Sequence, residues 1–388
     1  MSHLASSSAA LAVSLFLLGC AALRAQENPL EAPVPAKGGV AAPALAGAKI
    51  AVPDFVKPGA RFVYEGGSST ENDDPQKANS AGVGLTRFDV VAVTDTHVLL
   101  SVGTFLTALQ GSGHSYSGSS AGAFGDFEIR SGGALWIPKE VLEAYTTSDL
   151  MQVTTGPFEL NGRKYTTKTM TRITPESALR QVWDIGTGLK LSEQSGTGKA
   201  RRAGDLTGFN RKINGYSNYQ MFRQMKLPWL DAPAPAWVKD LHSMEYEGSQ
   251  TMYIQGGDPI SVPFTSTLEV QERGDNWIRF AMTMSMQQGQ PAKTSVNSGP
   301  GSVGCYWMHP DVLRRMKEGL IDEDQLLGTR LEYSQQDGPQ GRLGVLKETG
   351  SAHVLIWGYS LKDGALVYGR WDRPEFQQTT ELKLVDRK

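Results

Sequence analysis

The stretch PDFVKPGARFVYEG, residues 53–66, returns in altered form as PAWVKDLHSMEYEG, residues 235–248. Both stretches contain a proline, an aromatic residue two positions later, Val-Lys and then, after a gap of equal length, Tyr-Glu-Gly. The offset is constant, since 235 − 53 = 182 and 246 − 64 = 182. This repetition predicts that one folded unit is present twice in the chain.

Three further matches keep the same order along the chain. Residues 88–90 (FDV) match 268–270 (LEV), and Leu135-Trp136 matches Tyr306-Trp307, each pair being followed by a Val-Leu dipeptide. The stretch WDIGTGL, residues 183–189, matches YSLKDGAL, residues 359–366. Because the offset drifts only by loop-sized steps, we predict a tandem duplication.

Hydrophobic periodicity predicts the kind of unit that is repeated. In WIRFAMTMSM, residues 277–286, apolar side chains alternate with polar ones, as in a strand with one buried face. Short helices are predicted at 138–145, 310–319 and 218–225. The predicted fold is α+β and mainly antiparallel β, with two tandem homologous domains that each consist of a curved antiparallel sheet and one packed helix.

The N-terminal segment is typical of an exported protein. The apolar run AALAVSLFLLG, residues 9–19, has the length of a signal peptide, and it ends in Leu-Leu-Gly-Cys, which resembles a lipobox with Cys20 as the lipidated residue. Ordinary cleavage after Ala25 and a core helix over residues 9–19 are the alternatives. We expect an exported, periplasmic or cell-surface lipoprotein anchored to a membrane.

The expected organisation follows from these features and from composition. It comprises a signal peptide at 1–25, an Ala/Pro-rich tether at 26–52, a first β-rich domain at 53–214, a connector at 215–234 and a second β-rich domain at 235–388. The formal net charge of −2 gives no indication of a nucleic-acid partner. No nucleotide-binding motif and no metal-ligand spacing is present, so no cofactor is expected. Cys305, in an apolar context, is predicted to be a buried thiol.

Two candidate catalytic features can be identified, and both are weak. Gly118-Ser119-Ser120-Ala121-Gly122 matches G-x-S-x-G, which would make Ser120 a nucleophile. The surrounding Gly/Ser-rich composition instead favours a flexible loop, and 289–304 is a similar loop in the second copy; together the two loops could frame a binding mouth. The repeated Glu65 and Glu247 could form a pair of catalytic carboxylates. The acidic groups at 71–74 and 322–324 are predicted to be solvated loops.

The sequence MTMSM places Met282, Met284 and Met286 on one face of a strand. Their thioethers would lie about 7 Å apart, and soft sulfur suits Cu(I), as in the methionine motifs of exported copper-handling proteins that this one resembles. The same positions continue an apolar face, so core packing is the favoured interpretation.

The expected function is that of a non-enzymatic binding or scaffolding protein. Its expected partners are the membrane, through the lipid on Cys20, and a hydrophobic small molecule or a protein. A secreted hydrolase that uses Ser120 or the pair Glu65 and Glu247 is the first alternative, and a Cu(I)-binding protein is the second.

Overall fold

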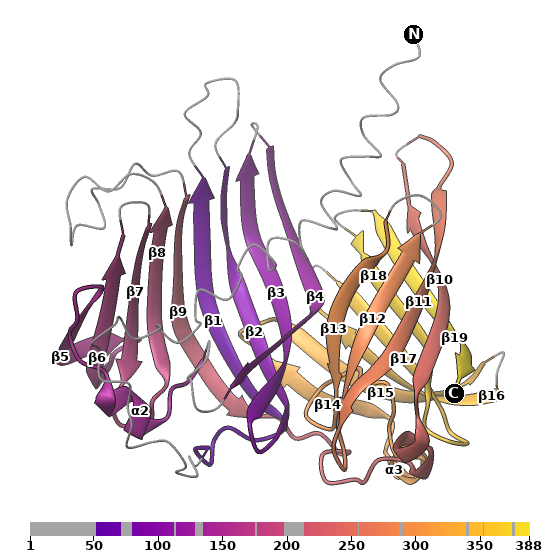
Figure 1. Ribbon diagram of the computed structural model, residues 1–388. Coiled ribbons are helices and arrows are strands. Elements are labelled where there is room, and N and C mark those ends of the chain that lie inside the picture. The colour runs from indigo at the N-terminus through magenta and orange to yellow at the C-terminus, as the bar shows by residue number, and fades with distance from the viewer. Residues whose placement is uncertain are drawn as a thin grey trace.

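Two large antiparallel sheets make up the folded part of the chain in the computed structural model (Figure 1). The structure describes residues 52–70, 80–111, 114–128, 135–174, 177–197, 213–254, 256–286, 290–338, 341–351, 353–374 and 377–388. The expected signal peptide, Cys20, the tether up to residue 51 and the acidic group at 71–74 lie outside these residues.

The first sheet has nine strands in the order β4-β3-β2-β1-β9-β8-β7-β6-β5. Its strands are β1 (Ala60–Thr70), β2 (Ser80–Val93), β3 (His97–Gly111), β4 (His114–Glu128), β5 (Met151–Leu160), β6 (Arg163–Ile173), β7 (Ser177–Asp184), β8 (Lys190–Thr197) and β9 (Ile213–Gln224). The short helix α2 (Lys139–Ala144) follows β4.

The second sheet has ten strands in the order β13-β12-β11-β10-β19-β18-β17-β16-β15-β14. Its strands are β10 (Ser243–Met252), β11 (Ile260–Arg273), β12 (Ile278–Met286), β13 (Ala292–Ser298), β14 (Gly319–Asp324), β15 (Thr329–Gly338), β16 (Gly341–Thr349), β17 (Val354–Ser360), β18 (Leu366–Arg373) and β19 (Gln378–Arg387). The 3-10 helix η3 (Ala236–Asp240) precedes β10, and the helix α3 (Pro310–Arg315) follows β13. The expectation of a mainly antiparallel β fold with few helices is confirmed.

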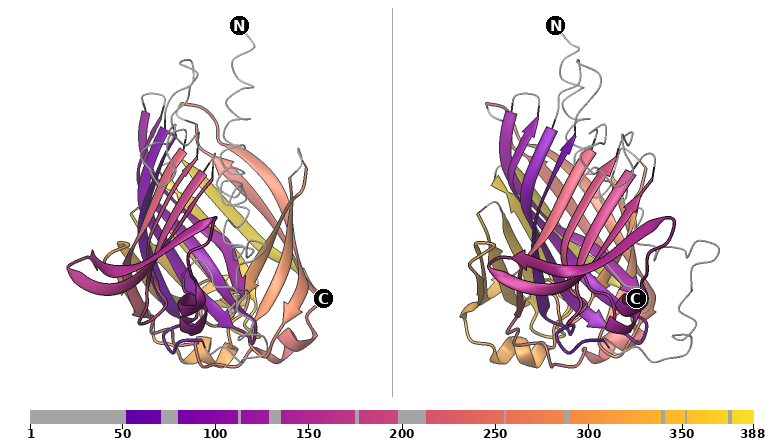
Figure 2. Two further views of the ribbon diagram at one scale, coloured as in Figure 1. Left: turned by 60° about the vertical axis from the view of Figure 1, so that its left-hand side comes forward. Right: turned by 90° about the vertical axis from the view of Figure 1, so that its left-hand side faces the viewer.

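The two sheets are built in the same way, and both are strongly curved (Figure 2). In each, the first strand lies inside the sheet between the second and the last strand, and the α-helix found among the described residues follows the fourth strand. The pairing of the first with the last strand shifts by one residue directly before Tyr64 in one sheet and directly before Tyr246 in the other. This arrangement is consistent with a tandem duplication.

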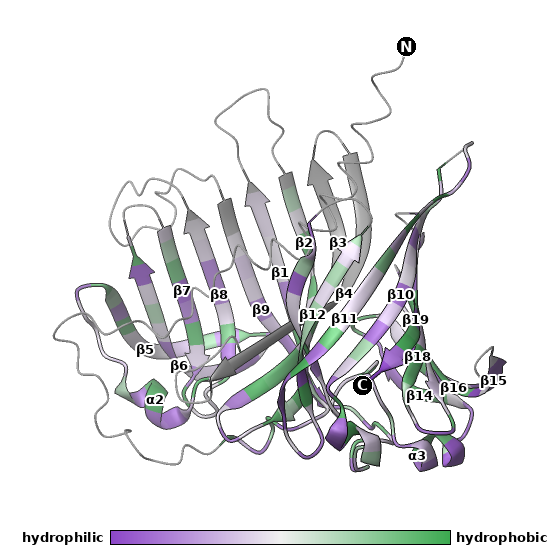
Figure 3. Cartoon of the chain, turned by 45° about the vertical axis from the view of Figure 1, so that its right-hand side comes forward, coloured by the Kyte–Doolittle hydropathy of each residue, from purple (hydrophilic) through white to green (hydrophobic). Residues whose placement is uncertain are grey.

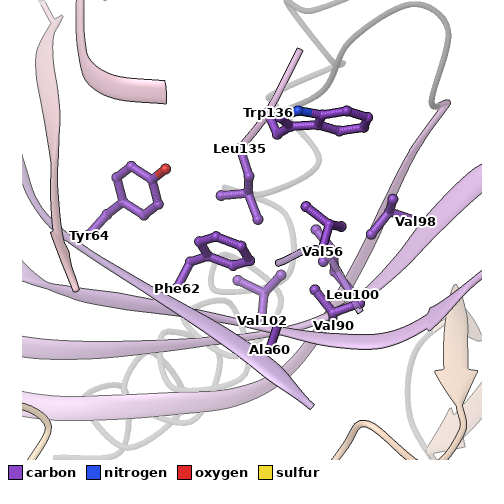
Figure 4. Close-up of a cluster of buried hydrophobic side chains, with 10 residues drawn as sticks. All are labelled: Val56, Ala60, Phe62, Tyr64, Val90, Val98, Leu100, Val102, Leu135 and Trp136. Atoms are coloured by element: carbon purple, nitrogen blue, oxygen red, sulfur yellow. The ribbon is translucent and has the colours of Figure 1, made fainter. Parts of the chain in front are cut away.

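A cluster of large apolar side chains covers the inner face of the first sheet. Phe62, Tyr64 and Val102 project from the strands, and Leu135 and Trp136 lie over them from the segment between β4 and α2 (Figure 4). The second sheet has an equivalent cluster that includes Tyr246, Phe280 and Trp307. Burial of this apolar area accounts for much of the stability of each half.

A repeated set of polar contacts fixes the segment that carries each tryptophan. Trp136 forms an isolated bridge with Leu189, and Trp307 forms one with Ala365. In each sheet, a tyrosine hydroxyl donates a hydrogen bond to the carbonyl oxygen of the residue that follows the bridge partner. The distance is 2.8 Å from Tyr64 to Lys190 O and 3.0 Å from Tyr246 to Leu366 O. Burial raises the pKa of both tyrosines well above the usual value, so each hydroxyl keeps the proton that it donates.

Three expectations about local structure are wrong. Residues 218–225 are not helical: β9 runs to Gln224, so the connector expected at 215–234 begins only after that strand. The two Gly/Ser-rich segments expected to be loops around a binding mouth contain strands β4 and β13. The predicted helix at 310–319 ends at Arg315.

The turn glycine at the centre of each contact set offers a test of this architecture. Gly364 has φ +79°, and a Cβ atom added there would lie 1.8 Å from the carbonyl oxygen of Met308. The N–H of Met308 in turn donates a hydrogen bond to the carbonyl oxygen of Gly364. We expect Gly364→Ala to lower the free energy of unfolding by roughly 3–5 kcal/mol, measured by urea titration. The same effect is expected for Gly188→Ala, because its Cβ would lie 2.0 Å from Ile137 O.

The matched control is Gly162→Ala, which has a similar φ of +72° but no atom within 4 Å of the added Cβ. It isolates the cost of the left-handed backbone, about 1–2 kcal/mol. Equal losses in the control and in Gly364→Ala would show that the close approach contributes nothing to stability.

Candidate functional site

The inner face of the second sheet, defined here as the face that bears Tyr246 and Phe280, is apolar well beyond its buried cluster. Along β12, Ile278 and Phe280 are buried, whereas Met282, Met284 and Met286 on the same face are only half-buried. Burial therefore decreases along the strand while the side chains stay hydrophobic.

Neighbouring strands extend this apolar surface. Met286 is paired with Phe264 of β11, and Phe264 is paired with Gly248 of β10, which in turn is paired with Leu382 of β19. Phe264 is buried and Leu382 is half-buried. We define the apolar face as Met282, Met284, Met286, Phe264 and Leu382. Its adaptable thioethers and its aromatic ring are suited to contact with an apolar molecule of irregular shape.

One of the three methionines takes part in core packing. Met282 packs against the buried cluster that contains Phe280 and Trp307, as expected for a core side chain. In the described part of the chain, no group of three or more His, Cys, Asp or Glu side chains is placed to hold a metal ion.

Ser120 lies in the interior of strand β4, where it is paired with Thr104 of β3. A nucleophile elbow requires the serine at a sharp turn between a strand and a helix, and this segment does not provide one. The side chain of Ser120 lies outside the described residues.

Glu65 and Glu247 occupy equivalent positions directly after Tyr64 and Tyr246, and both side chains are exposed. They belong to different sheets and lie on the face opposite to the two tyrosines, because successive strand residues alternate.

The largest group of buried charges was not anticipated from the sequence. It lies where the outer face of the first sheet meets the second sheet, and we call it the ionic interface. Its members are Arg61, Arg87, Asp89 and Arg223 from the first sheet, and Asp322, Asp324, Glu348 and His353 from the second. The prediction of a solvated loop at 322–324 is wrong, since these residues form the second half of β14 and Asp324 is buried.

Arg61 is at the centre of the ionic interface. It donates two hydrogen bonds to Asp89, at 2.7 and 3.0 Å, and a third across the interface to Asp324 at 3.3 Å. Burial alone would lower the pKa of Arg61, but Asp89, Glu348 and Asp324 outweigh it and raise that pKa further. Arg223 reaches Asp322 in a two-pronged contact, with nitrogen–oxygen distances of 2.8 and 2.6 Å.

Arg87 provides the second connection between the sheets. Its Nη1 donates to Glu348 Oε2 at 2.9 Å, and its guanidinium lies over the ring of Phe105. Burial alone would raise the pKa of Glu348, but Arg87, the hydrogen bond with His353 and the charge of Arg61 hold it far below its usual value. Glu348 is therefore an ionised acceptor, and Nε2 of His353, 3.1 Å away, is the donor.

These contacts point to a structural role for the ionic interface. The charges pair with one another, and most of the side chains are almost completely buried, which leaves little access for a substrate. Cys305 is also buried, as predicted, and its thiol donates to Trp307 O at 2.7 Å. Burial raises the pKa of this thiol to about 12, which makes it a poor nucleophile.

Comparison with known proteins assigns no function to these features. No protein-family model matches the chain, and no curated protein matches it. Among solved structures, it is similar to a protein of unknown function from the DUF3598 family of Nostoc punctiforme, with 11% identity, coverage of 83% of this chain and 94% of that chain, and a TM-score of 0.19. A TM-score that low supports no conclusion about fold or function. Within the described residues, no helix combines the length and apolar character needed to cross a bilayer.

The ionic interface predicts a pH-dependent loss of stability. Because the pKa of Glu348 is lower in the folded chain, its stabilising contribution is complete above about pH 4.3, the usual glutamate value, and is lost as the pH falls toward the folded pKa. We expect Arg87→Met to lower the free energy of unfolding by roughly 3–5 kcal/mol at pH 7, because it leaves a buried carboxylate without its main partner. The difference from wild type should narrow as the pH falls below about 4.3, because the stabilising contribution that Glu348 makes in wild type is lost over that range.

Lys139→Met is the control, since Lys139 and Glu143 form an exposed pair 3.8 Å apart. It should change stability by less than about 1 kcal/mol, with no such narrowing. If Arg87→Met behaved like this control, the charges between the sheets would not hold the two halves together.

Proposed function

We propose that this chain is an exported, lipid-anchored and non-enzymatic carrier, built from a duplicated β-rich domain, that holds an apolar ligand against the inner face of its second sheet. The lipid on Cys20 would be the membrane anchor, and the tether at 26–52 would separate the folded part from the bilayer. The observation that carries the proposal is the apolar face, where hydrophobic side chains continue beyond the buried cluster.

Three features support binding over catalysis. The apolar face lies on a curved sheet, and curved sheets are suited to enclosing a ligand on their inner side (Figure 3). Its half-buried methionines can adjust to ligands of different shape. The candidate carboxylates Glu65 and Glu247 are exposed on separate sheets, and Ser120 lies within a strand, so no described pair of catalytic groups favours the hydrolase alternative.

A pair of matched variants tests the proposal. Met284→Glu with Met286→Glu places charge on the apolar face, whereas Thr283→Glu with Ser285→Glu places the same charge on the opposite face of the same strand. Chloroform–methanol extraction of purified protein followed by mass spectrometry should find a non-covalent apolar compound in wild type and in the Thr283/Ser285 variant. We expect a loss on the order of tenfold or more in the Met284/Met286 variant, because burying a carboxylate against the ligand is costly.

Circular dichroism and a thermal melt establish that both variants are folded. A wild-type protein without any extractable compound would contradict the carrier function and would leave scaffolding as the proposed function. If Cu(I) raised the melting temperature of wild type but not that of a variant with Leu at 282, 284 and 286, the copper alternative would replace it.

Mass spectrometry of the mature N-terminus tests the anchor independently of the ligand. The proposed processing predicts a chain that begins at a lipid-modified Cys20. A free N-terminus at Gln26 would contradict lipidation, and an intact Met1 would contradict export.

A further inference from the structure

The hairpin between β10 and β11 ends in a group of exposed hydrophobic side chains. Tyr253, Ile254 and Ile260 are 49%, 50% and 42% exposed. Figure 3 shows this hairpin extending beyond the neighbouring strands of the second sheet. We call these three residues the apolar tip.

The apolar tip is continuous with the apolar face. Ile260, Val262 and Phe264 alternate along β11 and share one face, and Ile260 is paired with Met252 of β10. Phe264 is in turn paired with Met286. Hydrophobic side chains therefore connect the end of the hairpin to the proposed binding face along a single strand.

The backbone holds the tip in place. Gly257 N–H donates to Ile254 O at 3.1 Å, which closes a turn at the end of β10. Tyr253 N–H donates to Gln377 O at 2.8 Å and so connects the hairpin to the turn before β19. Tyr253 and Ile254 are thus presented from a fixed backbone.

The size of the tip decides which partner it fits. Three half-exposed side chains offer on the order of 300 Å² of apolar surface, whereas a stable protein interface needs about 800 Å² from each partner. A few inserted side chains are sufficient at a bilayer when a lipid anchor already keeps the protein there. Tyrosine is also a residue that favours the membrane interface.

We infer that the apolar tip inserts into the interfacial region of a lipid bilayer, and that the apolar ligand moves between the bilayer and the apolar face along β11. This inference rests on the proposed carrier function. Asp258, an exposed acidic residue in the same hairpin, makes a zwitterionic surface a better match than an anionic one.

Quenching by brominated lipid tests the contact. The full chain carrying Tyr253→Trp, anchored on vesicles of brominated phosphatidylcholine, should lose about half of the emission that the new tryptophan adds over wild type. Leu320→Trp is the control, because Leu320 is 51% exposed in β14, which directly follows α3 at the opposite end of the second sheet (Figure 1). Its added emission should not be quenched.

A second variant tests the route of the ligand. Ile254→Ser with Ile260→Ser should slow uptake of the extracted compound from phosphatidylcholine vesicles on the order of tenfold, while the amount bound at equilibrium stays unchanged. Leu320→Ser should leave the uptake rate as in wild type.

Equal quenching at positions 253 and 320, or none at 253, would overturn the inference. These outcomes can be distinguished from failure of the carrier function. If the protein holds extractable ligand but the tryptophan at position 253 is not quenched, the result supports the carrier function and contradicts the membrane contact. If the tryptophan at position 253 is quenched but the protein holds no extractable ligand, the result supports the membrane contact and contradicts the carrier function and the ligand route.

Discussion

The pairing of buried charges between the two sheets is the constraint on which the arrangement of the molecule depends. Arg61 and Arg87 lie on the outer face of the first sheet, where both are buried. Asp89 of the first sheet pairs with both arginines, but one carboxylate cannot balance two buried guanidinium groups, so this face also needs carboxylates from the second sheet. Asp324 and Glu348 supply those carboxylates from β14 and β16. The ionic interface therefore fixes which surfaces of the two halves come together.

Because these charges occupy the outer face of β1, β2 and β9, the inner faces stay free for hydrophobic side chains. In the first half, Leu135 and Trp136 cover the buried cluster of the inner face. In the second half, Trp307 belongs to the equivalent cluster, and the half-buried methionines of β12 continue past it. The apolar surface of the second sheet therefore extends beyond the segment that carries Trp307.

The sequence was informative where a residue type has one dominant structural use. Strict alternation in 277–286 identified β12, and the repeated Tyr-Glu-Gly identified two equivalent strands. It was misleading where tertiary pairing overrides local preference: β4 is rich in Gly and Ser, which suggested a loop, yet it pairs with β3 over most of its length. Asp324 was missed because an acid in a charged stretch gives no sign that an arginine 263 residues earlier, Arg61, lies opposite. Arg61 precedes Phe62, and Arg87 and Asp89 flank Phe88, as in any strand with one exposed face, so the pattern did not indicate that this outer face is buried.

The contact between the two halves is not symmetric. By strand order and register, Ser243 and Thr267 of the second sheet occupy the positions of Arg61 and Arg87. Neither can donate the forked, charged hydrogen bonds that an arginine supplies, and both are half-buried rather than enclosed. The outer face of the second sheet therefore cannot receive the carboxylate-bearing strands of another copy in the same way. For the same reason no twofold axis relates Glu65 to Glu247, so the two carboxylates are not brought together as a symmetric catalytic pair would require.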